Sequence, residues 1–252
     1  MTEINREVLS KVPEVTLVFW IIKILATTLG ETGGDTLSMS MHMGYLLSTG
    51  IFALVFIGAV LFQMNSKVFH PVTYWVTIIA TTTVGTTLAD FADRSLGIGY
   101  AGGSSVLLIL LLASLYIWYR DMGSISVTTV NSRKTELYYW VTIMFSQTLG
   151  TALGDWVADT EGLGYIDSAI IFGSALALIA MAYYKSRISR VTLFWMAFIL
   201  TRPLGAVVGD FLDKPISAGG LDLSRYTASA TLFFLIAILI FAFDHQPAKK
   251  AH

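Results

Sequence analysis

Eight long apolar stretches divide this chain of 252 residues and constrain its fold more than any other feature. They lie at 15–34, 44–62, 72–90, 100–119, 137–155, 165–184, 191–210 and 226–243. At about 1.5 Å per residue, each stretch can cross a hydrocarbon layer of about 30 Å as a helix. Hydrophobic residues make up 55% of the chain and charged residues 13%, whereas a soluble domain carries about 25% charged residues. The sequence therefore predicts an all-α integral membrane protein with eight transmembrane helices.

The composition also excludes several classes of function. The alternating polarity of a membrane-barrel strand is absent from the eight stretches. The lack of cysteine excludes disulfides, zinc–thiolate sites and thiol nucleophiles. A net charge of −1 without a basic face argues against a nucleic-acid partner. Because nucleotide-binding, metalloprotease and nucleophile-elbow motifs are also missing, we expect neither an enzyme nor a resident cofactor.

Basic residues are distributed unequally between the two sides of the predicted bundle. Eleven of the 16 Lys and Arg residues fall at the termini or in the connections that follow even-numbered stretches. The other connections contain only Arg94, Lys214 and Arg225, together with most of the acidic residues. Because Lys and Arg favour the cytoplasmic side, we expect both termini in the cytoplasm. The opposite, acidic side is explained either by the solubility of short loops or by a vestibule that attracts cations.

A fourfold internal repeat organises the eight stretches. The pattern Trp-x9-Gly-x3-[Gly/Ala]-Asp begins at Trp20, Trp75, Trp140 and Trp195, at intervals of 55, 65 and 55 residues. Each repeat is predicted to be a helical hairpin, in which helix A carries the tryptophan and the aspartate and helix B follows. Two crossings return the chain to the same side, so the pattern predicts four parallel two-helix repeats in a pseudo-fourfold ring, or a pair of pairs.

The repeats are expected at 15–62, 72–119, 137–184 and 191–243, within a single transmembrane domain that covers residues 1–252. The pattern resembles a bacterial inner-membrane family defined by four tandem repeats, each with two membrane helices and a recurring tryptophan. The resemblance implies the fold and a multi-pass location in the bacterial inner membrane. Because that family is one of unknown function, the resemblance implies no mechanism and no functional residue.

Two of the repeated residue types favour a structural interpretation. The small residues on helix A are spaced by four, which lets helix backbones approach closely inside a membrane. The pairs are Gly30 with Gly34, Gly85 with Ala89, Gly150 with Gly154, and Gly205 with Gly209. The tryptophans lie near the predicted cytoplasmic ends of the helices, where we interpret them as anchors at the membrane interface.

The repeated aspartates favour a functional interpretation. Each lies 15 residues beyond its tryptophan, which places it about 22 Å along the helix and in the outer third of the membrane. A carboxylate at that depth is costly unless it faces a cavity, a partner or an ion. Rings of acidic residues select cations in known pathways. The predicted cation or metal ligands are therefore Glu31, Asp35, Asp90, Asp155 and Asp210.

A polar stripe leads down each helix A from its aspartate in steps of four residues, so its members share one helix face. We expect these residues to act as pathway residues or charge partners of the site. They are Lys23, Thr27, Thr82, Thr86, Gln147, Thr151 and Arg202. Two interpretations of the stripe stay open, because such residues either line a polar pathway or join helices by hydrogen bonds.

The favoured function is a cation transporter or channel, either proton-coupled or specific for a divalent metal such as Mn²⁺, Mg²⁺ or Ca²⁺, because carboxylate and hydroxyl oxygens suit hard ions. One alternative is a carrier of small organic solutes, with Lys23 and Arg202 binding an anionic group. Another is a membrane scaffold that transports nothing. The expected partners are the lipid bilayer and a small cation, and the sequence is compatible with a homo-oligomer.

Overall fold

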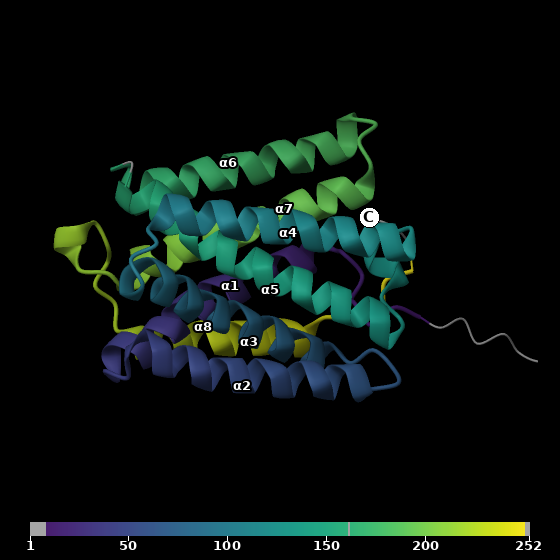
Figure 1. Cartoon of the computed structure of the whole chain (residues 1–252), viewed down its shortest axis with the longest axis horizontal. Coiled ribbons are helices and arrows are strands. Elements are labelled where there is room, and N and C mark those ends of the chain that lie inside the picture. The colour runs from purple at the N-terminus through teal and green to yellow at the C-terminus, as the bar shows by residue number, and fades with distance from the viewer. Residues whose placement is uncertain (1–8, 161, 250–252) are drawn as a thin grey trace, which may run out of the picture.

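The computed structural model describes residues 9–160 and 162–249, which form an all-helical bundle (Figure 1). Within this part, the α-helices are α1 (Leu17–Asp35), α2 (Gly44–Asn65), α3 (Pro71–Asp90), α4 (Tyr100–Met122), α5 (Arg133–Asp155), α6 (Gly164–Lys185), α7 (Arg190–Asp213) and α8 (Arg225–Ala242). Short helical turns lie in the connections: η1 (Thr36–Ser40), η2 (Phe91–Ser95), η3 (Val127–Thr129), η4 (Trp156–Thr160) and η5 (Ile216–Ala218). The predicted all-helical fold is therefore confirmed, with boundaries close to those of the eight apolar stretches.

Local sequence explains where several of these helices begin and end. The hydroxyl of Thr16 accepts a hydrogen bond from the backbone of Phe19 and caps α1. Ser132 and Thr135 form a reciprocal capping box at the start of α5. A π-helical turn begins directly after the aspartate in each of the first three repeats. Such π-helical turns are rare in proteins overall, but those that occur are often at functional sites. Their recurrence after three of the four aspartates therefore indicates a candidate functional site at this end of the bundle.

The four A helices form a closed ring. Helix α1 packs against α3, α3 against α5, α5 against α7, and α7 against α1. The B helices lie outside this ring, and each packs on the A helix of the following repeat: α2 on α3, α4 on α5, α6 on α7, and α8 on α1 (Figure 1). The two helices of a predicted hairpin therefore follow one another in sequence, but their main packing partners lie in other repeats. Helix α1 is already covered by α3, α7 and α8, so α2 finds its main surface on α3.

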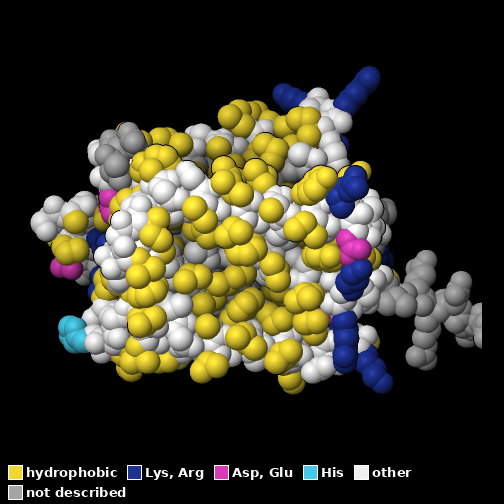
Figure 2. Space-filling model, viewed as in Figure 1, with side chains coloured by type: hydrophobic (Ala, Val, Ile, Leu, Met, Phe, Trp, Pro, Cys, Tyr) yellow, Lys and Arg dark blue, Asp and Glu magenta, His cyan; other side chains and the backbone are white. Residues whose placement is uncertain are grey.

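Six of the helical segments are long and apolar enough to cross a membrane, namely α1 with its π turn, α2, α4, α6, α7 and α8. The other two, α3 and α5, are ring helices with many buried Thr, Ser and Gln residues. Each of them is covered by three neighbouring helices, which explains how it can be more polar than the rest. Figure 2 shows hydrophobic side chains spread over the face of the bundle, with Lys and Arg gathered at one end.

The repeated glycines are the points of closest approach between ring helices. The first glycine of each repeat faces a side chain from the next repeat in the ring. The pairs are Gly30 with Thr82, Gly85 with Gln147, Gly150 with Arg202, and Gly205 with Thr27. A Cβ atom at Gly205 would lie 2.8 Å from the backbone carbonyl carbon of Thr27, where no side chain fits. The close packing predicted from the small residues is thus confirmed.

Three of the four repeated tryptophans are core residues of the ring. Trp75, Trp140 and Trp195 are 0%, 2% and 3% exposed, so the prediction that they anchor the membrane interface is wrong for these three, whereas Trp20 is only partly buried. They pack with other buried aromatic residues, including Tyr74 and Tyr139, whose hydroxyl oxygens lie 2.6 Å apart. The inner face of a ring helix meets other ring helices instead of lipid, so aromatic side chains on that face fill the interior.

The first and last described segments meet at the end of the bundle where Lys and Arg gather (Figures 1 and 2). Pro13 and Pro247 form an isolated antiparallel bridge, and Ala248 N donates to Val12 O at 2.8 Å. Lys11 Nζ lies 2.7 Å from Glu136 Oε1 on α5, which ties the first segment to the ring. Both segments therefore close the same end of the bundle, as the even number of helices requires.

The close approach at Gly205 gives the first testable prediction. Gly205→Ala should lower the free energy of unfolding by about 1–3 kcal/mol, because the added methyl group overlaps Thr27 on α1. Gly33→Ala is the matched control, since a Cβ there meets no atom within 4 Å and alanine favours a helix by about 1 kcal/mol over glycine. Thermal unfolding in detergent measures both. Equal stability of the two variants would contradict the packing described here.

Candidate functional site

Arg202 on α7 contacts all three of the other ring helices. The two hydrogen atoms of its Nη2 are shared among three acceptors: Glu31 Oε2 on α1 at 2.8 Å, Thr86 Oγ1 on α3 at 2.6 Å, and Thr151 Oγ1 on α5. The side chains of Arg202 and Glu31 are 0% and 3% exposed. An ion pair this deeply buried needs further hydrogen bonds to offset the loss of water. The two threonines supply some of them, whereas Arg202 Nε and Nη1 are buried without a partner among the described residues. The guanidinium therefore lies at the centre of the ring.

The aspartates of the second and third repeats are joined by Arg94. Its Nε atom lies 2.9 Å from Asp90 Oδ1, and its Nη2 atom lies 3.3 Å from Asp155 Oδ2. Both aspartate side chains are 3% exposed, whereas that of Arg94 is 33% exposed. Arg94 belongs to the π turn η2 and follows Asp90 by four residues, which places the two on the same side of the helix end.

The aspartates of the fourth and first repeats are joined in the same way by Lys214. Its Nζ atom lies 2.7 Å from Asp35 Oδ2 and 3.0 Å from Asp210 Oδ1. Lys214 follows Asp210 by four residues, so it occupies the position in the fourth repeat that Arg94 occupies in the second. The corresponding residues of the first and third repeats are Met39 and Asp159. The aspartates are thus held as two pairs, each with its own cation.

Two groups of three buried carboxylates share Asp210. Glu31, Asp155 and Asp210 present oxygen atoms that all lie within 4.8 Å of one another, and the same is true of Asp35, Asp210 and Asp213. Among the described residues, Asp35 Oδ1 and Asp213 Oδ1 have no hydrogen-bond partner although both atoms are buried. Buried oxygen atoms without a partner are costly, so both are available to a ligand.

We use the term carboxylate cluster for six acidic and four basic side chains that meet at this end of the ring. Arg225 is its last member, and its Nε atom lies 2.9 Å from Asp213 Oδ2. The members are Glu31, Asp35, Asp90, Asp155, Asp210, Asp213, Arg94, Arg202, Lys214 and Arg225. Six negative and four positive groups give these ten residues a formal charge of −2 when all are ionised, and Asp159, whose Oδ2 atom lies 3.8 Å from Arg94 Nη2, adds a further carboxylate at the edge. This excess of negative charge favours a cation, and carboxylate oxygens suit Mg²⁺, Mn²⁺ or Ca²⁺.

Of the five predicted cation ligands, four fall within the two groups of close carboxylates, and Asp213 is the member that sequence reasoning did not select. The fifth, Asp90, lies in neither group and is paired with Arg94. Asp213 and the cations Arg94, Lys214 and Arg225 were visible as outer-side residues without an assigned role. The signal that could have identified Asp213, Arg94 and Lys214 is their spacing of three or four residues from a repeated aspartate.

The predicted pathway residues divide into two kinds. Thr86 and Thr151 contact Arg202, as described above. Thr27 and Thr82 join ring helices without contacting Arg202: Thr27 Oγ1 donates to the Thr201 carbonyl at 3.1 Å, and Thr82 Oγ1 donates to the Ala26 carbonyl at 3.2 Å. Thr86 also joins two ring helices, since its hydroxyl lies 3.1 Å from the Gly30 carbonyl. These hydroxyls favour the interpretation of the stripe as helix-joining hydrogen bonds.

The two remaining pathway residues lie deeper in the ring. Gln147 is fully buried, and its side-chain nitrogen and oxygen have no partner among the described residues. Lys23 is fully buried, and its Nζ atom donates to Thr201 Oγ1 at 3.3 Å. Neither residue belongs to the carboxylate cluster, so the structure separates them from the predicted cation ligands.

The fold and the site together define the class of this protein: an all-helical repeat protein with a charged interior and a largely apolar exterior. The family model described as Repeat of Unknown Function (DUF347) matches residues 18–69, 73–123, 138–189 and 193–243, and the chain belongs to this family. The four matched segments correspond to the four repeats predicted from the tryptophan and aspartate pattern. No curated protein and no solved structure matches the chain.

The ion pair at the ring centre gives the second prediction. Arg202→Met keeps the aliphatic stem that packs on Gly150 but leaves Glu31 buried without its cation. The variant should lose about 3–5 kcal/mol of stability. Adding Glu31→Gln should recover at least about 1 kcal/mol of the summed losses, which a double-mutant cycle of unfolding measures. Strictly additive losses would show that the two side chains are not coupled.

Proposed function

We propose that this protein is a membrane-embedded cation carrier and that the carboxylate cluster is its binding site. The supporting observation is the presence of two groups of three buried carboxylates that share Asp210. Asp35 Oδ1 and Asp213 Oδ1 are buried there without a hydrogen-bond partner among the described residues, so they are free for a ligand. The substrate class is a hard divalent cation such as Mn²⁺, Mg²⁺ or Ca²⁺, because all ligand atoms are oxygen and the cluster has a formal charge of −2. Because a carboxylate binds either a proton or a metal cation, the carrier exchanges protons for the transported cation in this proposal.

In this proposal all eight helices cross the bacterial inner membrane as four parallel repeats with pseudo-fourfold symmetry. Six helices meet the requirement for length and hydropathy, and α3 and α5 are shielded from lipid by their neighbours. The end that carries most Lys and Arg, together with both termini, faces the cytoplasm. The carboxylate cluster then opens to the opposite side, where a cation arrives first.

A carrier fits the ring better than a continuous pore. Arg202 and Glu31 fill the ring centre and connect all four ring helices. A cation moving further must displace the guanidinium, which requires the ring helices to shift. In the empty state Arg202 and Lys214 act as internal cations that neutralise part of the cluster. When the transported cation replaces Arg202 or Lys214 at a carboxylate, cation binding is coupled to movement of the ring helices.

A scaffold is the main alternative, because ion pairs between repeats also hold a bundle together. The charge of −2 and the unpartnered atoms Asp35 Oδ1 and Asp213 Oδ1 favour ligand binding, since a purely structural network gains by pairing every buried group. An enzyme is not proposed, because the cluster contains carboxylates and cations without a nucleophile beside a base.

Transport in liposomes gives the third prediction. Asp155→Asn and Asp210→Asn preserve the shape of the side chain but remove a charged ligand, so uptake of Mn²⁺ should fall at least about tenfold. Asp167→Asn is the matched control, because Asp167 is an exposed acidic residue outside the cluster and should leave uptake unchanged. The cation proposal fails if both cluster variants fold and transport like the parent, or if the parent moves no divalent cation under any gradient.

The role of Lys214 as an internal cation gives the fourth prediction. Lys214→Met should open the site between Asp35 and Asp210, so the affinity for Mn²⁺ should rise about tenfold. The increase in melting temperature caused by added Mn²⁺ measures this affinity. Lys67→Met, which removes an exposed cation from the opposite end, is the control. A scaffold predicts the reverse, with Lys214→Met destabilised and Mn²⁺ without effect on either variant.

A further inference from the structure

A second polar layer crosses the interior of the ring, one helical turn from the contacts of Glu31. It has one residue from each ring helix, three positions before the first repeated glycine, and each of them packs against that glycine of a neighbouring ring helix. The four fully buried members are Thr27, Thr82, Gln147 and Arg202. The hydroxyls of the two threonines already donate to carbonyl oxygens. The other two members keep donors that are not used.

Gln147 and Arg202 present their unused donors to the same part of the ring. Thr151, which accepts from Arg202 Nη2, follows Gln147 by one turn of α5, and the stem of Arg202 packs on Gly150 of that helix. Arg202 Nε and Nη1 and both side-chain atoms of Gln147 are buried without a partner among the described residues. Because Nε carries one hydrogen atom, and Arg202 Nη1 and Gln147 Nε2 carry two each, free donors outnumber the one free acceptor, Gln147 Oε1.

Lys23 adds a second cation to this part of the ring. Its side chain is fully buried, and its Nζ atom donates to Thr201 Oγ1 at 3.3 Å and lies 4.2 Å from the centroid of the Phe198 ring. Thr201 directly precedes Arg202, and the charges of Lys23 and Arg202 are close enough to repel each other. Among the described residues, no carboxylate oxygen lies within 4.0 Å of Lys23 Nζ, whereas Arg202 is paired with Glu31. Two cations and one anion leave these three groups with a charge of +1 when all are ionised.

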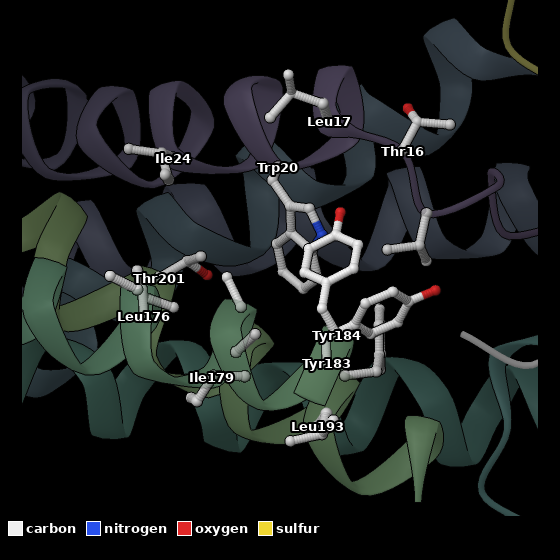
Figure 3. Close-up of a pocket in the computed structure, with 15 residues that line it drawn as sticks. Thr16, Leu17, Trp20, Ile24, Leu176, Ile179, Tyr183, Tyr184, Leu193 and Thr201 are labelled. Carbon is white, nitrogen blue, oxygen red and sulfur yellow. The ribbon is translucent and has the colours of Figure 1, made fainter. Parts of the chain in front are cut away.

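The outer surface of the ring does not supply a counter-ion for Lys23. Thr201 also lines an apolar groove of about 570 Å³ between α1, α6 and α7 (Figure 3). Lys23 does not line this groove, whose other side-chain hydroxyls belong to Thr16, Tyr183 and Tyr184. The Thr201 hydroxyl accepts from Lys23 and donates to the Phe198 carbonyl at 2.7 Å, so it links Lys23 to α7 and not to the groove. The ammonium group therefore belongs to the ring interior.

We propose that the ring interior binds one halide ion, chloride, between the ammonium group of Lys23, the amide of Gln147 and the Nε and Nη1 atoms of Arg202. The excess of donors and the charge of +1 favour an anion, since buried polar groups need partners and a buried charge needs an opposite charge. A single-atom ion suits the site, because the ring helices touch at their glycines and the next layer contains the buried side chains of Ile78, Ile143 and Phe198. This inference does not depend on the cation proposal, which concerns the carboxylates beyond the guanidinium.

The site is tested on purified protein in detergent by exchanging sodium gluconate for sodium chloride at constant ionic strength. Equilibrium binding of radioactive chloride should saturate at about one ion per chain. The melting temperature should rise by about 3–6 °C for each tenfold increase in chloride above the dissociation constant, because the ion binds only the folded ring. Bromide should act like chloride, and gluconate should have no effect because of its size.

Three variants identify the residues that hold the ion. Lys23→Met should lose saturable chloride binding, and its melting temperature should be the same in chloride and in gluconate. Gln147→Glu places a fixed carboxylate beside the same donors, so its melting temperature in gluconate should equal or exceed that of the parent in chloride. It should also bind chloride at least about tenfold more weakly than the parent. Lys185→Met removes an exposed cation and should keep the response of the parent.

Two results would overturn the proposal. A parent protein that binds no chloride and melts at the same temperature in both salts would show that Lys23 needs no counter-ion. A chloride response that persists in both Lys23→Met and Gln147→Glu would place the ion elsewhere on the protein. If Gln147→Glu does not fold, Lys23→Met alone decides between these results. Chloride binding and melting temperature are measured without a cation gradient, so the outcome is distinct from that of the cation-flux experiments.

Discussion

The structure depends on placing one guanidinium where four helices meet. Arg202 bonds to Glu31, Thr86 and Thr151, so each of the other ring helices contributes one oxygen atom to the same Nη2 atom. A buried cation tolerates little displacement from its partners, because each lost contact exposes a charge to an apolar medium. The position of every ring helix is therefore coupled to the same group. The ring helices are therefore held in place while these charges are paired, and they can shift when another ion competes for the same partners.

The glycines and the charged residues act on the same interfaces. Gly150 receives the stem of Arg202, and Gly205 receives Thr27, so the small residues make room for the polar side chains of the next repeat. The outer cations break the equivalence of the four repeats, since Arg94 and Lys214 occur only in the second and fourth. The backbone of the ring therefore repeats four times, whereas its aspartates form two pairs, one joined by Arg94 and the other by Lys214.

Much of the architecture was predictable because apolar length and exact repetition are local signals. The helix boundaries followed from apolar length, the common end of the first and last described segments from the even number of helices, and the close approach at the glycines from their spacing. The partner of each helix did not, because whether α2 packs on α1 or on α3 depends on what already covers α1. The burial of Trp75 and Trp140 was missed for the same reason. At the site, the repeated aspartates marked the right end of the ring, but Asp213, Arg94 and Lys214 lie outside the repeated pattern, so repetition did not select them.

The packing of each B helix on the next repeat has a consequence for the order of synthesis. Helix α1 is made first and carries Lys23 and Glu31, whereas their contacts Thr201 and Arg202 lie 178 and 171 residues later. Its outer cover, α8, is the last helix of all. In the proposed membrane arrangement, α1 holds Lys23 and Glu31 in or near lipid until α7 and α8 arrive, which is costly. We therefore expect insertion of the first helix to be protected or delayed, with closure of the ring as the last step.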